Sequence, residues 1–460
     1  MEIQLPAEFT KRMSSQLGAD FELYTKSLTD TPPTSIRWNP HKAQTISQQN
    51  CNDKVLWEPM GEYLPSRPVF TLDPLLHAGA YYVQEASSMF VGYVAKQIIP
   101  NNEKATILDL CAAPGGKSTH LASIFDSKQL LVCNEVIGSR VAVLCENITK
   151  WGNPNVIVTN NDAKDFKALV NFFDLVVVDA PCSGEGLFRR EPLAINEWSP
   201  QNTELCAQRQ QRIIADIWDS IKPGGYLIYS TCTFCPQENE ENMAWIAKTF
   251  DAKNIAINID DKWNITPIEK NNCIGYRFIQ HKTKGEGFFC CVFQKNNETK
   301  NTITKWKIKN QNTLAPKSLA KNLTKLTTPD YQFDYYIKNN IVIGCSQEFN
   351  QEITLLQNKL KVVKSGVAIA KLFGEKFTPE HDLAMSWAIN NNEFDCIDLS
   401  LRDALSYLHR DNIFIANSKI GCNLVTYQNT PLGFIKNIGQ RWNNLYPQNW
   451  KIKMNIPNEL

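Results

Sequence analysis

The sequence has little net charge: 48 Lys and Arg residues stand against 47 Asp and Glu residues, which leaves a formal net charge of +1. A strongly basic balance would favour a nucleic-acid partner, so composition alone neither supports nor excludes one, and any basic surface must be local. No apolar run approaches the roughly 18 residues that cross a bilayer. Residues 1–4 lack the basic and apolar regions of a signal peptide. We therefore expect a soluble, cytoplasmic protein.

Metal and disulfide motifs are also scarce. Cys232 and Cys235 form one C-x-x-C pair, but there is no second pair. Cys290 and Cys291 lie in an apolar run that reads as a strand, on which adjacent side chains face opposite ways. We therefore expect no metal site. Fourteen cysteines in 460 residues do not indicate a disulfide framework, and most of them should be core residues.

The hydrophobic pattern divides the chain into four parts. Residues 1–83 predict an N-terminal extension that is helical at first and then loop-rich, with several prolines. Residues 84–295 alternate short apolar runs with amphipathic helices, which predicts an α/β fold around a mostly parallel sheet. Residues 296–330 are rich in Lys, Asn and Thr and predict a linker, for which an RNA-tracking segment is the alternative. Residues 331–460 predict a smaller mixed domain.

Strand ends are the places to search for a site, because ligands of a parallel sheet bind beyond the carboxyl ends of its strands. The apolar runs that predict buried strands lie at 105–110, 130–134, 173–179 and 225–230. In the C-terminal part, residues 335–343 predict a β-hairpin around Asn339-Asn340.

A glycine-rich loop follows the first of these runs and leads into an amphipathic helix. The loop consists of Cys111, Ala112, Ala113, Pro114, Gly115, Gly116 and Lys117. The two glycines allow the backbone to approach a ligand closely, and the helix offers free N–H groups and a positive dipole end. A plain strand–helix turn is the alternative interpretation.

Three acidic residues stand after later apolar runs. Glu135 lies where a carboxylate can hold two ribose hydroxyls, Asp162 where an acid can accept from an adenine amino group, and Asp179 ends the run at 173–179. Each alone is more often a surface cap. Together with the glycine loop they predict a nucleoside cofactor, and since no P-loop is present, S-adenosylmethionine fits better than a nucleoside triphosphate.

Two cysteines, Cys182 and Cys232, come just past two strands whose ends face the same side of the sheet, so both thiols can reach one substrate. A thiolate that adds to carbon 6 of cytosine makes carbon 5 enamine-like and able to attack a sulfonium methyl group. The other thiol is a candidate for removing the carbon 5 proton, and the residues leave open which thiol attacks. The alternative is that both are small core residues.

Activation of the Cys232 thiol also stays open. A helix predicted to open at 236–240 would favour the thiolate through its dipole. Glu238, Glu240 and Glu241 would oppose that effect if they lie close.

These motifs resemble the Sun/Fmu-type RNA cytosine-5 methyltransferases. The resemblance rests on 111–117, on Asp179-Ala-Pro-Cys182-Ser-Gly and on Thr231-Cys232, with support from 35–39 and 82–88. Residues 433–437 and 444–447 resemble the bacterial small-subunit ribosomal RNA methyltransferase F subgroup.

The resemblance implies a Rossmann-like class I methyltransferase sheet with an RNA-binding N-terminal extension and an RNA-binding, PUA-like α+β C-terminal domain. It implies that Cys232 is the nucleophile and that Cys182 assists product release. The residues that it assigns to S-adenosylmethionine are 111–117, Glu135, Asp162 and Asp179. Cys235 is not required by the family and is treated as packing.

The resemblance also implies an RNA partner, and we expect a monomer. Ribosomal RNA is the expected substrate, transfer RNA is the alternative, and a non-catalytic ribosome-assembly factor is the alternative from another class. A DNA methyltransferase is disfavoured because Thr231-Cys232 would have no role there.

Several residues outside these motifs could contact the RNA backbone. Arg37, Trp38 and Arg189-Arg190 could hold phosphates, with a solvated surface as the alternative. Basic and aromatic residues interleave near the C-terminus, where aromatic core packing is the alternative. These residues are Lys436, Arg441, Trp442, Tyr446, Trp450 and Lys451.

Overall fold

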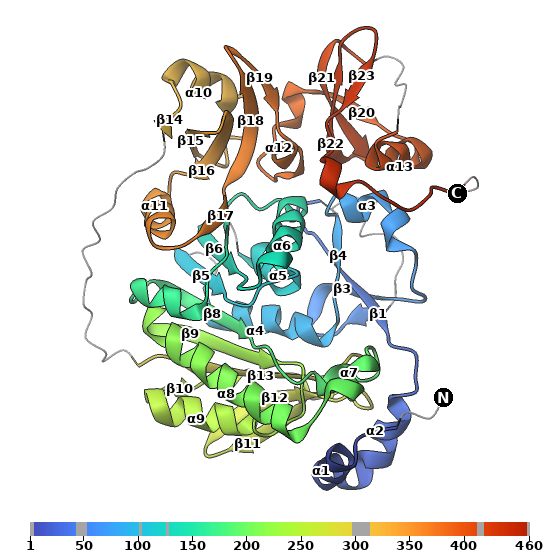
Figure 1. Ribbon diagram of the computed structural model, residues 1–460, viewed down its shortest axis with the longest axis vertical. Helices are drawn as coiled ribbons and strands as arrows, with labels where there is room; N and C mark the ends of the chain where they lie inside the picture. Colours follow the sequence, from blue (N-terminus) through green and yellow to red (C-terminus); the bar gives the residue numbers. More distant parts are fainter. Residues whose placement is uncertain are drawn as a thin grey trace.

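The computed structural model describes residues 4–42, 53–100, 104–125, 128–296, 313–411 and 418–457. Its centre is a ten-stranded sheet with the order β11-β12-β13-β9-β8-β5-β6-β7-β17, with β10 paired to β13 (Figure 1). The five parallel strands are β5 (Ala105–Asp109), β6 (Gln129–Asn134), β7 (Val156–Thr159), β8 (Phe173–Asp179) and β9 (Ile221–Thr231). The predicted α/β sheet and its four predicted strands are confirmed.

Antiparallel strands complete both edges of this sheet. They are β10 (Lys253–Asn254), β11 (Thr266–Lys270), β12 (Cys273–Phe278), β13 (Phe288–Gln294) and β17 (Val362–Ser365). Cys290 and Cys291 both lie on β13 and are fully buried in different cores, as the alternation of a strand requires.

Helices cover both faces of the sheet, which explains why its central strands are apolar on both sides. One face packs against α4 (Phe90–Ile98), α5 (Gly116–Ile124) and α6 (Gly138–Trp151). The other packs against α8 (Pro200–Ile217), α9 (Glu240–Phe250) and α11 (Asn350–Lys359). A short helix, α7 (Leu193–Glu197), follows the end of β8. Among the described residues, no helix has the length and apolar character needed to cross a membrane.

The N-terminal part differs from its prediction. Its helices, α1 (Ala7–Leu17) and α2 (Phe21–Ser27), are followed by a four-stranded sheet in the proline-containing stretch that was expected to be loop-rich. The sheet has the order β2-β3-β1-β4. Its strands are β1 (Thr34–Trp38), β2 (Lys54–Val55), β3 (Glu58–Leu64) and β4 (Tyr81–Val83), with α3 (Pro74–His77) before the last. Pro59 is tolerated in β3 because it lies beyond the last pair with β1, Gly61 opposite Arg37.

The C-terminal part contains two further sheets. The first has the order β14-β15-β16-β18-β19 and the second the order β20-β21-β22-β23. Their strands are β14 (Thr313–Leu314), β15 (Phe333–Lys338), β16 (Ile341–Ser346), β18 (Val367–Phe373), β19 (Lys376–Pro379), β20 (Asp395–Asp398), β21 (Gly421–Tyr427), β22 (Thr430–Asn437) and β23 (Trp442–Asn444). Asn339 and Asn340 join β15 to β16 with φ of 51° and 61°, so the predicted hairpin is confirmed.

The structure differs in two respects from the predicted linker and C-terminal part. Residues 297–312 lie outside the described residues, but β14 and α10 (Lys317–Thr324) fold onto the first C-terminal sheet, and Leu323 is fully buried. In addition, β17 leaves the C-terminal part and pairs with β7, Val362 opposite Thr159. The four-part division therefore stays a prediction, and the structure shows that one strand of the central sheet comes from 200 residues further along the chain.

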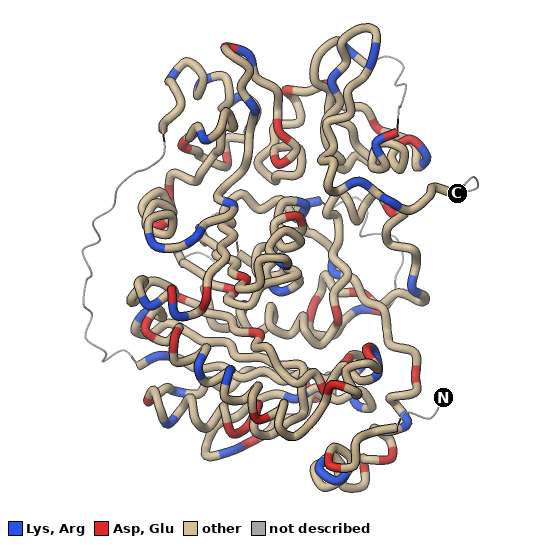
Figure 2. The backbone as a smooth tube through the Cα atoms, in the orientation of Figure 1, with Lys and Arg blue, Asp and Glu red and all other residues tan. Residues whose placement is uncertain are grey.

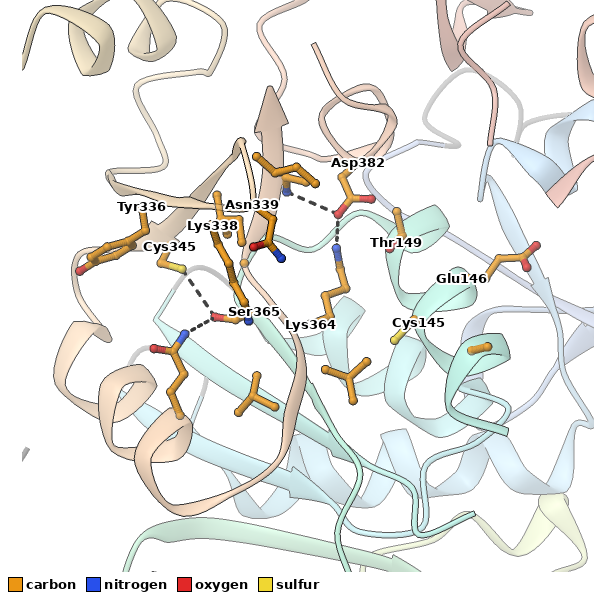
Figure 3. A pocket seen from close by; sticks show the side chains of 18 of the residues that line it. Cys145, Glu146, Thr149, Tyr336, Lys338, Asn339, Cys345, Lys364, Ser365 and Asp382 are labelled. Atoms are coloured by element: carbon orange, nitrogen blue, oxygen red, sulfur yellow. Dashed lines mark hydrogen bonds and ion pairs between the residues drawn. The ribbon is translucent and has the colours of Figure 1, made fainter. Parts of the chain in front are cut away.

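A cavity of about 820 Å³ lies between α6, the β15–β16 hairpin and β17 (Figure 3). Lys364 of β17 forms an ion pair with Asp382 of α12 (His381–Met385) beside it.

The remaining helix, α13 (Leu401–His409), packs on the second C-terminal sheet. Lys and Arg are interspersed with Asp and Glu over the described chain (Figure 2), which fits the net charge of +1.

Candidate active site

The predicted cofactor loop connects the end of β5 to the start of α5. The Leu110 N–H donates to the carbonyl of Val177, and the Ala112 N–H donates to the carbonyl of Asn134, so the loop is tied to both neighbouring strands. Gly115 has a φ of +117°, which a side chain would strain, and α5 begins at the next residue. The backbone N–H groups of the first turn of α5 therefore point toward the end of the sheet.

The two acids predicted to hold the nucleoside lie at the ends of β6 and β7. Glu135 accepts a hydrogen bond from the Ile137 N–H (2.8 Å), and Asp162 accepts one from the Lys164 N–H (3.2 Å). A carboxylate has about four acceptor positions, so both keep capacity for hydroxyl and amino groups. The glycine loop follows the neighbouring strand β5 and supplies backbone N–H donors. These donors, together with the two carboxylate acceptors, fit a nucleoside cofactor.

Asp179 and Lys117 form an ion pair at the end of β8. Lys117 Nζ lies 2.7 Å from Asp179 Oδ2, and the hydroxyl of Ser230 donates to Asp179 Oδ1 (2.8 Å). Burial alone would lower the pKa of Lys117, but the Asp179 carboxylate, with smaller contributions from Asp109 and Cys232, raises it above its usual value. A charged ammonium group therefore acts electrostatically on Cys232.

The two predicted thiols meet at the ends of β8 and β9. Cys182 Sγ lies 3.1 Å from Cys232 Sγ, and the Cys232 N–H donates to Cys182 Sγ (3.3 Å). Neither thiol is fully covered by the fold. The hydrogen bond to Cys232, together with burial, raises the pKa of Cys182 well above its usual value. The structure thus brings Cys182, Cys232 and Lys117 together in one place.

The three acids that follow Cys232 differ in whether a cation offsets their charge. Glu240 forms an ion pair with Arg277, and Glu241 lies 3.7 Å from Lys270, so each has a cation as partner. Glu238 is fully buried and is held by neutral donors instead. Burial raises the pKa of Glu238 to about 7. Of the three acids, Glu238 is the one whose charge is not offset by an ion pair with a described residue.

The helix predicted to open at 236–240 begins at Glu240. Its N-cap, Asn239, accepts from the hydroxyl of Thr231 (2.6 Å) and donates to the carbonyl of Thr233 (2.8 Å). The positive end of α9 is therefore attached to the residues on either side of Cys232, where it favours negative charge.

A second buried carboxylate, Glu185, was missed by sequence reasoning. Its oxygens accept from Trp198 Nε1 (2.7 Å) and from the Phe234 N–H (3.2 Å), and its Oε2 lies 2.7 Å from the guanidinium of Arg12. Helix α1 is thereby fastened to the loops that carry both thiols. A single acid in a loop gives no sequence signal for such a contact, because its three partners are far apart in the chain.

Two arginines that were considered for phosphate binding are internal. Arg189 pairs with Glu286 (3.1 Å), and its side chain is 5% exposed. Arg37 is 1% exposed and donates to Gln84 Oε1 (2.8 Å) and to the hydroxyl of Thr119 (2.8 Å). Both interpretations of Arg37, phosphate contact and solvated surface, are therefore wrong, and it joins β1 to α5. Arg190 is exposed.

For the aromatic residues near the C-terminus, the sequence analysis weighed RNA contact against core packing, and their burial differs from one residue to the next. Tyr446 is fully buried in the core of the second C-terminal sheet, whereas Trp442 and Trp450 are half-buried. Lys150 of α6 lies 5.4 Å from the centre of the Trp450 ring, so this tail contacts a helix that packs on the central sheet. Core packing is thus correct for Tyr446.

Replacing Arg37 with Met should destabilise the protein by about 3 kcal/mol, because the buried acceptors of Gln84 and Thr119 lose their donor. Urea unfolding followed by tryptophan fluorescence measures the change. Arg190→Met is the matched control and should leave the unfolding free energy within about 0.5 kcal/mol, because Arg190 is exposed. Equal stability of the two variants would contradict the structural role of Arg37.

Family models match three parts of the chain. Residues 96–294 match the 16S rRNA methyltransferase RsmB/F model. Residues 5–86 match the N-terminal domain of 16S rRNA methyltransferase RsmF, and residues 394–452 match the methyltransferase RsmF PUA domain. The presence of an N-terminal domain and of a C-terminal PUA domain is therefore confirmed, and RNA binding by the N-terminal part stays a prediction.

Curated relatives match most of the chain. A ribosomal RNA small subunit methyltransferase F from Aeromonas hydrophila is 30% identical over 379 residues, which cover 81% of this chain and 79% of that protein. The protein of the same name from Shewanella woodyi is 29% identical over 400 residues, which cover 83% of this chain and 79% of that protein.

Solved structures share the fold. A methyltransferase homologue from Pyrococcus horikoshii has a TM-score of 0.55 at 24% identity and covers 64% of this chain and 96% of its own. NSun6 from the same organism has a TM-score of 0.54 at 20% identity and covers 64% of this chain and 99% of its own. Together with the methyltransferase family model over residues 96–294, the shared fold shows that the Rossmann-like sheet is that of class I methyltransferases. From its three family models and its similarity to curated relatives over most of their length, we conclude that the chain belongs to the ribosomal RNA small subunit methyltransferase F family.

Proposed function

We propose that this protein methylates carbon 5 of a cytosine in small-subunit ribosomal RNA, with Cys232 as the nucleophile and Cys182 assisting product release. The observation that carries the proposal is the pair of thiols at the ends of β8 and β9, with Sγ atoms 3.1 Å apart. Methyl transfer to an oxygen or nitrogen atom needs no thiol. Methylation at carbon 5 of a pyrimidine needs one to add to the ring and benefits from a second group to release it.

The cofactor is S-adenosylmethionine, which supplies an electrophilic methyl group. The residues that would hold it are those of the 111–117 loop together with Glu135, Asp162 and Asp179. The loop and α5 provide backbone N–H donors, and the carboxylates of Glu135 and Asp162 accept from hydroxyl and amino groups.

The reaction then proceeds in three steps on the cytosine ring. The Cys232 thiolate adds to carbon 6, and carbon 5 becomes nucleophilic. When bound, S-adenosylmethionine would supply the methyl group that carbon 5 takes, and its sulfur atom would keep the electron pair of the broken sulfur–methyl bond. A base removes the proton on carbon 5, the carbon 5–carbon 6 double bond forms again, and the bond between carbon 6 and Cys232 Sγ breaks to release the thiolate.

The surrounding charges favour Cys232 as the attacking thiol. The ammonium of Lys117 and the N-terminus of α9 both lie beside Cys232, and both stabilise a thiolate. The hydrogen bond with Cys232 and burial keep Cys182 protonated, since its pKa is raised. A protonated Cys182 can donate to the Cys232 thiolate before the attack.

The cytosine must leave its stack to reach both thiols, since ring chemistry at carbons 5 and 6 is blocked inside a helix. The family relatives are named for small-subunit ribosomal RNA, which supports that substrate over transfer RNA. Bisulfite sequencing of total RNA from a deletion strain tests the choice. A lost mark in small-subunit ribosomal RNA is the expected result, and a mark lost only from transfer RNA would contradict it.

Replacing Glu135 with Gln should raise the dissociation constant for S-adenosylmethionine by about tenfold to a hundredfold, since hydrogen bonds to a charged acceptor contribute about 1.5–3 kcal/mol. Isothermal titration calorimetry measures the change. Glu241→Gln is the matched control, because Glu241 lies on α9 beside Lys270 and should not affect cofactor affinity. Failure of the wild-type protein to bind the cofactor would instead favour a non-catalytic ribosome-assembly factor.

A further inference from the structure

We propose that Glu238 is a positioning residue that locks the two thiol loops together and keeps the proton on Cys182, so that the attack comes from Cys232. The inference rests on the proposed function, which assigns different tasks to the two thiols. It concerns a residue that contacts neither the cofactor loop nor Lys117, and its evidence is the network of hydrogen bonds directly behind the thiols.

The carboxylate of Glu238 binds the residue that follows Cys182 directly and, through it, the residue that follows Cys232. Its Oε2 accepts from the N–H of Ser183 (3.0 Å), and its Oε1 accepts from the hydroxyl of Ser183 (2.5 Å). The hydroxyl of Ser183 lies in turn 2.8 Å from that of Thr233. Ser183 follows Cys182 and Thr233 follows Cys232, so one carboxylate sets the position of both loops.

The rest of the network fixes the carboxylate itself. Gln210 of α8 donates to Glu238 Oε2 (2.8 Å) and to the carbonyl of Pro181 (3.1 Å), the residue before Cys182. The hydroxyl of Tyr229 on β9 donates to the backbone carbonyl of Glu238 (2.6 Å). Glu238, Gln210 and Tyr229 are all fully buried. Because each bond is made inside the core, the geometry behind the thiols is fixed before any substrate arrives.

Burying a carboxylate among neutral donors is unfavourable, and a core built only for stability would avoid it. The raised pKa of Glu238 reflects that burial. An unfavourable charge held next to a reactive pair is typical of functional sites. We therefore look for a task that needs the negative charge itself.

The charge creates a difference between two otherwise similar thiols. Glu238 is one of the groups that raise the pKa of Cys182, after the hydrogen bond to Cys232 and burial. The Lys117 ammonium lies beside Cys232 instead. The other nearby acids are neutralised, since Glu185 pairs with Arg12 and Asp179 with Lys117. The Glu238 carboxylate accepts from the N–H of the residue next to Cys182, so its charge disfavours a thiolate at Cys182.

Glu238→Gln removes this charge with little change in shape. The amide oxygen can take the place of Oε2 and accept from Ser183 and Gln210, and the amide nitrogen can donate to the hydroxyl of Ser183. That hydroxyl can then turn to donate to Thr233, 2.8 Å away. The loops should stay in place while the charge is lost.

Competitive alkylation with iodoacetamide at about pH 8.5, well above the pKa of about 7 of Glu238, keeps that carboxylate charged. Peptide mass spectrometry then measures the two thiols separately without RNA or cofactor. In the wild-type protein Cys232 should be modified first. In Glu238→Gln the rate for Cys182 relative to Cys232 should rise about tenfold, the effect of a shift of about one pKa unit. An unchanged ratio in a folded Glu238→Gln protein would overturn the inference.

Two further variants separate charge from structure. Glu240→Gln removes a buried carboxylate from the same segment, but its partner is Arg277, so the alkylation ratio should not change. Glu238→Asp keeps the charge on a shorter arm and should retain the preference for Cys232 while turnover falls. If Glu238→Gln does not fold, loss of the preference in Glu238→Asp overturns the inference. Because the assay needs no turnover, its failure is distinct from a failure of the proposed reaction.

Discussion

Replacing Cys232 with Ala should abolish methyl transfer, with a fall in kcat of about 10⁴-fold or more, because the reaction loses its nucleophile. Carbon 5 of cytosine does not attack a methyl group unless a thiolate has added to carbon 6. The measurement is transfer of a radiolabelled methyl group to small-subunit ribosomal RNA. The same reactions, run on a denaturing gel, should show no RNA bound covalently to the variant.

Cys235→Ala is the matched control for this variant. Cys235 lies three residues further along the same turn and is fully buried, and its thiol donates to Gln237 Oε1 (3.0 Å) rather than to the site. Its replacement should leave kcat within a few-fold of the wild type. Full activity of Cys232→Ala would contradict the assignment of the nucleophile and, with it, the proposed covalent mechanism.

Replacing Cys182 with Ala should have the opposite effect on the covalent adduct. Cys232 can still add to carbon 6, and carbon 5 can still take the methyl group. Because Cys182 is assigned to product release, its loss should slow that step, and turnover should fall by about 10²–10⁴-fold. The enzyme should then accumulate on a denaturing gel as a complex with methylated RNA.

The double variant Cys182→Ala/Cys232→Ala decides whether the complex forms through Cys232. It should give no adduct at all, and ribonuclease digestion of the single-variant complex should leave a methylated nucleotide on the peptide that contains residue 232. Rapid turnover of Cys182→Ala, or an adduct in the double variant, would show that the thiols do not divide the work as proposed.

Much of the central sheet could be predicted from the sequence, because its signal is local. The strands from Ala105 to Thr231 are buried on both faces, so each reads as a short continuous apolar run. The turn at Asn339-Asn340 was equally visible, since Asn tolerates positive φ. Both features depend on neighbouring residues only, and both predictions are confirmed.

Other strands gave no such signal. Those of the N-terminal sheet are short, and β3 contains a proline, so the stretch was expected to be loop-rich. Strand β17 is half-exposed and pairs with β7 some 200 residues away. A strand of four residues acquires its place from its partner, and no local pattern identifies that partner.

The charged residues show the same limit within the site. Arg37 and Arg189 were expected at the surface or on phosphate, but both are buried with specific acceptors. Glu238 was weighed only as an acid that could oppose thiolate formation at Cys232, whereas the structure attaches it to the residue after Cys182. Burial and partner choice depend on contacts between distant segments.

The sequence by itself determined which chemical groups follow each strand: the glycine loop, the acids and the two cysteines. Parallel strands then require those groups to share one edge of the sheet, which is why the meeting of Cys182 and Cys232 could be expected. Only the tertiary structure decided what surrounds each thiol, with Lys117 and the start of α9 beside Cys232 and the buried Glu238 behind Cys182. The physical reason is that ionisation depends on burial and on charges a few ångströms away, and distant segments of the chain supply both.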